Sequence, residues 1–176
     1  MCIRDRVSAP CTGESVMTSF GPRATTQVTG VQNLTSSYAN LNGSIFTYRP
    51  PTGTHTVIYK FVYQISNHDA DGIAHLRFYV GPSGSAQEIV YATHTVRADD
   101  FQNRVHFEWP IRIDPSQATD LNHGRLQSWD EDKILKLGVR EYNSSYEMKL
   151  HVTNNYDGAG TDQFSMPVIT ISALGS

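Results

Sequence analysis

The stretch RVHFEWPIRI at 104–113 decides the fold class. Polar residues alternate in it with apolar ones, which are Val105, Phe107, Trp109, Ile111 and Ile113. A period of two places every second side chain on the same face of an extended strand. One face is then apolar and the other polar, as in an antiparallel sheet packed on one side. Pro110 has no backbone N–H, which predicts that this strand lies at a sheet edge or carries a bulge there.

The same alternation recurs along the chain. Strands are expected over 44–48, 56–65, 74–80, 88–97, 133–142, 146–152 and 168–174, with a weaker one over 28–33. Turn residues separate them, as in the segment PPTG at 50–53. Eight to nine antiparallel strands without a significant helix predict an all-β sandwich of jelly-roll topology. An immunoglobulin-like sandwich is the alternative, although its strands are usually shorter.

The N-terminal stretch lacks this periodicity. We expect residues 1–27 to form a disordered arm and residues 28–176 to fold as a single sandwich domain. The opening residues MCIRDR are either an artefactual prefix, of the kind found on translated sequence assemblies, or the start of a real flexible arm. The chain's two cysteines, Cys2 and Cys11, fall within this arm, which argues against a disulfide scaffold or a structural zinc site.

Composition narrows the class of protein. The chain has 176 residues, of which 39% are hydrophobic and 18% charged, with a net charge of −3. These values indicate a globular protein without a transmembrane helix, so we expect no membrane partner. The negative charge argues against nucleic-acid binding by phosphate neutralisation.

Catalytic signatures are weak. The seven histidines lack a pair spaced two residues apart on one strand, the arrangement of cupin metal sites. The segment GPSGS at 81–85 has serine where a nucleophile elbow has its final glycine. We therefore expect that the protein is not an enzyme and needs no cofactor, calcium aside.

Three segments of the sequence resemble segments of a known protein family. They are FTYRPP at 46–51, LGVREY at 137–142, and GTDQFSMP at 160–167 before a closing Ile169-Thr170-Ile171. Over most of the chain this pattern resembles the jelly-roll heads of marine phage structural proteins, which are similar to tumour-necrosis-factor and complement-type heads. The resemblance implies a virion structural protein, either a capsid decoration or the head of a tail fibre or tail tip. It also implies other virion proteins as partners, and location in the virion after assembly in the host cytoplasm.

Exposed aromatic residues favour an alternative function. Side chains such as Tyr79, Trp129 and Tyr156 are suited to stacking on sugar rings, so the second hypothesis is a carbohydrate-binding or receptor-recognition module. Trp129, His123 and Tyr156 are then the candidate contacts with a host surface glycan. The competing interpretation is that Trp129 plugs one end of the sandwich.

Two acidic loops are candidate calcium sites. Asp69 and Asp71 lie in one, and Asp157 and Asp162 in the other, each beside glycines. Calcium binds six to eight hard oxygen ligands of this kind. Neither loop matches the EF-hand pattern, and the same residues occur in ordinary turns.

Several strands are apolar on both faces. Ile58, Val62, Val90 and Ile134 lie opposite the residues expected to fill the core. Excess apolar surface usually marks an interface, and closed symmetric assemblies are the common result. The sequence therefore predicts self-association, and the resemblance points to a homotrimer.

Overall fold

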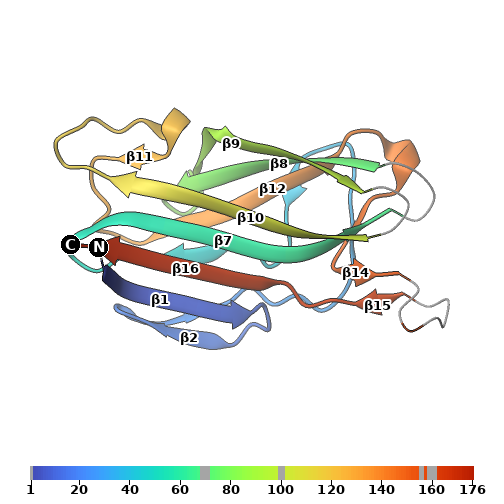
Figure 1. Cartoon of the computed structure of the whole chain (residues 1–176), viewed down its shortest axis with the longest axis horizontal. Helices are drawn as coiled ribbons and strands as arrows, with labels where there is room; N and C mark the ends of the chain where they lie inside the picture. Colours follow the sequence, from blue (N-terminus) through green and yellow to red (C-terminus); the bar gives the residue numbers. More distant parts are fainter. Residues whose placement is uncertain (1, 68–71, 99–101, 155–156, 158–161) are drawn as a thin grey trace.

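The computed structural model describes residues 2–67, 72–98, 102–154, 157 and 162–176. Two sheets pack face to face, and both chain ends lie at the same end of the molecule (Figure 1). The helical elements of the described residues are two single 3₁₀ turns, η1 (Leu121–His123) and η2 (Ser144–Tyr146). The predicted all-β class is confirmed, and the layers are consistent with a β-sandwich.

The first sheet has the strand order β1-β16-β7-β10-β11. The bounds are β1 (Cys2–Pro10), β16 (Val168–Gly175), β7 (Thr54–Ser66), β10 (Gln102–Ile113) and β11 (Arg125–Leu126). All neighbours are antiparallel except β10 and β11. Two short strands, β13 (Lys149–Leu150) and β4 (Gln32–Asn33), extend the sheet beside one end of β7.

The second sheet has the order β5-β12-β8-β9, and β6 also pairs with β12. The bounds are β5 (Ala39–Asn40), β6 (Phe46–Tyr48), β8 (Gly72–Gly81), β9 (Gln87–Ala98) and β12 (Lys133–Glu141). Two small pairs complete the described strands: β2 (Ser15–Thr18) with β3 (Gly21–Ala24), and β14 (Val152–Thr153) with β15 (Gln163–Phe164).

The core lies between the two sheets and follows the alternation of the sequence. On β7, Tyr59 is fully buried, with its ring centroid 4.8 Å from that of Phe78 on β8. Phe107 on β10 packs 5.3 Å from Phe78 and 6.1 Å from Tyr59. The predicted inward direction of Phe107 is confirmed, and Trp109 is partly buried against the same cluster.

The prediction that Pro110 lies at a sheet edge is confirmed. Pro110 sits opposite Ile58 of β7, whereas β11 covers β10 only at Arg112 and Ile113. The missing N–H of the proline is therefore tolerated on the open side of β10.

The N-terminal stretch requires a correction, because residues 2–10 are the strand β1 rather than a disordered arm. This strand pairs with β16 along its length, and Val7 is buried against the core. Cys11 is also fully buried. Burial raises the pKa of the Cys11 thiol to about 12, despite a hydrogen bond with the backbone of Ile169 that lowers it.

The expected strand over 146–152 is also corrected. It breaks into η2, β13 and β14, because Glu147 and His151 have φ angles of 44° and 63°. A residue in the left-handed region is not extended, so it interrupts a strand.

Candidate functional site

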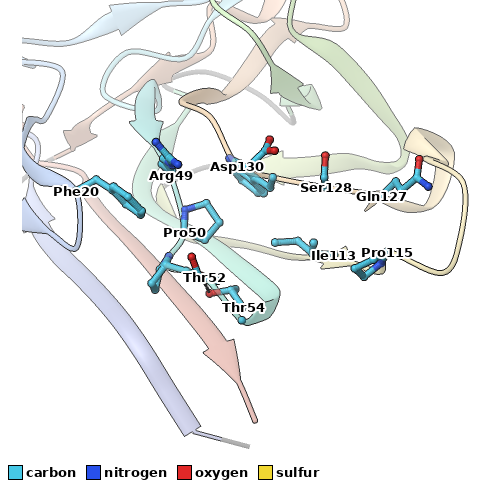
Figure 2. Close-up of a pocket in the computed structure, with 13 residues that line it drawn as sticks. Phe20, Arg49, Pro50, Thr52, Thr54, Ile113, Pro115, Gln127, Ser128 and Asp130 are labelled. Carbon is cyan, nitrogen blue, oxygen red and sulfur yellow. Dashed lines mark hydrogen bonds between the residues drawn. The ribbon is translucent and has the colours of Figure 1, made fainter.

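The first candidate site is a pocket of about 300 Å³ at the end of the sandwich where the termini lie. We call it the end pocket. Its walls come from the turn between β6 and β7, the segment after β10, the segment before β12, and the tip of the β2–β3 hairpin (Figure 2). Pro50, Pro51 and Ile113 supply apolar surface, while Arg49 and Asp130 bring opposite charges.

Trp129 forms part of this wall, but it is only 5% exposed. Its indole Nε1 donates a hydrogen bond to the carbonyl oxygen of Tyr48, at 3.2 Å. Its ring stands edge-on to the Tyr48 ring, with centroids 6.3 Å apart. This packing matches the interpretation of Trp129 as an end plug and leaves little of the ring for a ligand.

The polar side chains of the end pocket include Arg49, Ser128 and Asp130. The Arg49 guanidinium lies 4.3 Å from the centroid of the Phe20 ring, a cation–π contact that orients it. Ser128 and Asp130 line the same pocket. No histidine or cysteine is among the lining residues, so the described part of this pocket holds no such base for Ser128.

His123 lies in η1, and its ring centroid is 4.8 Å from that of Tyr91 on β9. Its Nδ1 is 2.8 Å from the Asp120 carboxylate. The hydrogen bond with His123 lowers the pKa of Asp120 below its usual value. The structure does not place His123 among the residues lining the end pocket with Trp129, and Tyr156 lies outside the described residues.

The calcium hypothesis stays a prediction. Asp69 and Asp71 lie outside the described residues, whereas Asp157 and Asp162 are both exposed. Within the described ranges, no three His, Cys, Asp or Glu side chains come together as a metal cluster.

A second candidate site, of which the sequence analysis named only Tyr79, lies on the outward face of the second sheet. We call it the cation–aromatic face: Tyr38, Arg77, Tyr79, Lys136 and Arg140. The guanidinium carbons of Arg77 and Arg140 lie 4.1 and 5.4 Å from the centroid of the Tyr38 ring. The Lys136 ammonium lies 5.5 Å from the centroid of the Tyr79 ring.

The register of β12 and β8 explains why the side chains of the cation–aromatic face lie together. Lys136 pairs with Tyr79, Gly138 with Arg77, and Arg140 with His75 across β12 and β8. Because paired residues of antiparallel strands point to the same side, these side chains share one face. The alternation within each strand predicts on which face of the sheet a side chain lies. It does not predict which strands are neighbours, so the cluster is not apparent from the sequence.

The electrostatics of this face are positive. Partial burial and then the charge of Arg140 lower the pKa of His75. Burial acts to lower the pKa of Arg77, but a hydrogen bond with Tyr79 and the charge of Glu88 raise it overall. Glu88 is 3.5 Å from Arg77, and it is the one acidic side chain directed outward in the described parts of β8, β9 and β12.

The four residues of the predicted interface do not form one surface. Ile58 and Val62 lie on the outward face of the first sheet. Ile134 lies on the outward face of the second sheet. Val90 is 45% exposed, in the part of β9 where the register with β8 shifts. A single interface patch can therefore include Ile58 and Val62 but not all four residues.

Among the described residues, neither 3₁₀ helix is long or apolar enough to cross a membrane.

No protein-family model matches the chain, and no curated protein matches it. Among solved structures, the chain is weakly similar to infectious bursal disease virus, Gt strain, with 10% identity and a TM-score of 0.32 over 91% of this chain and 45% of that chain. A subviral particle of VP2 from infectious bursal disease virus gives 12% identity and a TM-score of 0.25 over 93% and 48%. The chain thus spans about half the length of the viral capsid chains to which it is distantly similar.

Proposed function

We propose that this chain is a non-enzymatic structural protein of a virus particle, built on a jelly roll and self-associating into a trimer. The role is that of a capsid decoration or the head domain of a tail fibre or tail tip. Its location is then the virion, and its partners are copies of itself and other virion proteins. The resemblance described from the sequence segments supports this proposal.

The order of the strands supports the jelly-roll topology. The chain passes between the sheets in the order β1, β6, β7, β8, β9, β10, β12 and β16. β16 returns to lie between β1 and β7, and β12 returns to lie between β6 and β8. Two such long-range returns are the connections expected of a jelly roll, which consists of two Greek keys.

The observation that carries the self-association proposal is the outward face of the first sheet. Val62 lies beside Val168 of β16, and Ile58 lies beside Pro110 of β10. Leu174 belongs to the same face. The inner residues of these strands already fill the core, so these outward apolar side chains are surplus to what the monomer needs. We call the five residues together the aliphatic face: Ile58, Val62, Pro110, Val168 and Leu174.

Some polar groups on the outward face of this sheet are paired with one another. Lys60 of β7 and Glu108 of β10 lie 3.6 Å apart and compensate each other. Ser8 of β1 and Thr170 of β16 share a hydrogen bond of 2.9 Å. Polar groups that already have partners cost less free energy to bury in an interface than unpaired ones do.

Immunogold electron microscopy of purified particles tests the structural role. An antibody raised against the folded protein should label intact particles at repeated positions on the capsid or on the tail. If the protein is abundant in infected cells while purified particles carry no label, the proposed role is wrong.

Glycan recognition is the second candidate function, and the end pocket is the observation that favours it. The pocket combines the stacked pair Phe20 and Arg49 with the carboxylate of Asp130, so it offers both apolar and hydrogen-bonding surface. A glycan array should then show binding that Arg49→Ala removes. Trp129→Ala tests the sequence prediction in the same assay, and Arg49→Ala remains informative if the loss of Trp129 unfolds this end.

A further inference from the structure

We propose that the cation–aromatic face binds a saccharide unit that carries a carboxylate or a sulfate group. The site is the shallow depression between Tyr38 and Tyr79, with Lys136 pairing with the acidic group. This inference does not depend on the proposed virion role, and it assigns a ligand class to a surface on the opposite side of the sandwich from the aliphatic face.

The depression has a volume of about 360 Å³ and is lined by Tyr38, Ala39, Asn40, Tyr79, Ala86, Lys136 and Gly138. It therefore offers two aromatic rings, one ammonium group and one amide side chain. Aromatic rings present apolar surface to the C–H groups of a sugar, and the amide suits its hydroxyl groups. The volume accommodates one or two sugar rings.

Gly138 creates the room for this arrangement. A Cβ atom at this position would lie 3.0 Å from Cε2 of Tyr79, which is closer than an ordinary van der Waals contact. Because glycine has no side chain, the Tyr79 ring can lie over β12 and form one wall of the depression. The floor of the site is thus backbone rather than side chain.

Tyr38 forms the other wall and is held in place by the two arginines. Arg77 and Arg140 come from adjacent strands, and both guanidinium groups are within 6 Å of the same ring. Hydrogen bonds involving Gln32 support the adjoining loop: its amide nitrogen donates to the Asn40 carbonyl, and its amide oxygen accepts from the Asn42 N–H. A ligand would therefore meet a wall that is already ordered.

Charge complementarity favours an acidic ligand. Three cations share this face with Glu88, whose carboxylate already lies 3.5 Å from Arg77. Like charges on neighbouring strands repel each other, and a bound anion would relieve that repulsion. Lys136 lines the depression directly, and neither arginine is among its lining residues.

A sugar acid fits these observations better than a nucleic acid does. Strong binding of a phosphate backbone requires a row of cations along its path, whereas Lys136 is the one cation among the residues that line this depression. The net charge of −3 over the whole chain also repels a long polyanion. A small ligand with one negative charge is subject to little of this repulsion.

The test is ligand-observed and protein-observed NMR of the full chain with four probes. These are 3′-sialyllactose, a chondroitin sulfate disaccharide, neutral lactose and a short oligothymidylate. We expect both acidic sugars to bind, to shift the amide signals of Asn40 and Gly138, and to bind at least about tenfold more tightly than lactose.

Two variants locate the site. Lys136→Met should weaken binding of the acidic sugars at least about tenfold, since it keeps the side-chain length and removes the charge. Gly138→Ala should weaken it similarly, because the added methyl group displaces Tyr79. Lys149→Met, on β13 of the other sheet, is the matched control and should leave binding unchanged.

Four results would overturn the proposal. They are equal binding of lactose and the acidic sugars, undiminished binding by Lys136→Met, tighter binding of oligothymidylate than of either acidic sugar, and no binding of any probe. The melting temperatures of the variants show whether each one folds. Because the assay does not use particles or oligomers, its failure leaves the virion proposal untouched.

Discussion

His151 is the residue whose environment departs most from that expected of its type. It is fully buried, and its backbone is in the left-handed region with φ of 63°. Its ring lies 6.3 Å from that of Tyr63, which is also buried. Burial lowers the pKa of the His151 ring from 6.5 to about 4, although the nearby backbone of Asn42 offsets part of this effect.

The depressed pKa predicts a loss of stability in acid. Below pH 6.5 the unfolded chain binds a proton at His151 that the folded protein does not bind until about pH 4. Folding therefore becomes less favourable as the pH falls through this window, by about 2 kcal/mol at pH 5. Urea unfolding at pH 7 and pH 5 measures this difference.

His151→Asn is the matched variant, because asparagine tolerates a positive φ and does not titrate. Between pH 7 and pH 5, the decrease in the free energy of unfolding should be about 2 kcal/mol smaller for this variant than for the native protein. Identical pH dependence of the two proteins would mean that the buried imidazole is not the acid-sensitive group.

Phe107 and His106 are neighbours that face opposite sides of β10. Phe107 is buried against Tyr59 and Phe78, whereas His106 is exposed. Phe107→Ala should reduce the free energy of unfolding by about 3–5 kcal/mol. His106→Ala should change it by less than about 0.5 kcal/mol. Comparable losses in chemical denaturation would show that the register of β10 is shifted by one residue.

Alternation alone predicts which side chains of β10 point inward, because the period of a strand is independent of its neighbours. The burial of Trp129 is not predictable in this way. It lies outside the regular strands, and its packing depends on Tyr48, which is distant in the sequence. Loop side chains of this kind take their environment from tertiary contacts.

At the scale of elements, β1 is the strand that the sequence pattern conceals. Of its nine residues, Val7 and Ala9 are the buried apolar ones, so the alternation is short. The register with β16 also shifts between Ile3 and Asp5, which interrupts the period of two. Pairing with β16, rather than the strand's own hydrophobic pattern, stabilises β1.

The structure predicts that a chain beginning at Val28 is strongly destabilised. Removing residues 1–27 exposes the backbone of β16 and uncovers the core beside Cys11 and Val7. A loss of at least about 5 kcal/mol follows from the apolar area and the hydrogen bonds removed. For a protein of this size, the melting temperature should then fall by about 10–20 °C.

Arg23→Ala is the control for this truncation. It removes only the exposed contact between Arg23 and Asp132, in which one guanidinium nitrogen lies 2.9 Å from both carboxylate oxygens. Its cost should be below about 1 kcal/mol. A truncated chain that melts within a few degrees of the full chain would show that β1 adds nothing to the fold.

The longer strands are the elements that sequence reasoning identifies well. β7, β8, β9, β10, β12 and β16 each overlap the range expected from the alternation. The strand breaks at Glu147 and His151 are not predictable in this way, because hydrophobic periodicity does not reveal a left-handed backbone conformation. Neither residue is glycine, so composition gives no warning of the two breaks.

At the scale of the whole molecule, the sandwich presents two outward faces of different chemistry. The aliphatic face lies on the first sheet, and the cation–aromatic face lies on the second. We propose the first as the surface for self-association and the second as the site for an acidic ligand. The sequence places most of the residues concerned on outward strand faces, but the grouping depends on the sheet order, which alternation does not reveal.

Self-association through the aliphatic face is the central claim, and sedimentation equilibrium of the full chain tests it most directly. At micromolar concentration we expect particles of three chains of 19.6 kDa each. Val62→Asp should convert them to monomers, because a carboxylate in this face is desolvated without a partner on association. Thr93→Asp on the exposed part of β9 should remain trimeric. A native protein that sediments as a 19.6 kDa monomer, or a trimer that Val62→Asp leaves intact, would contradict the account.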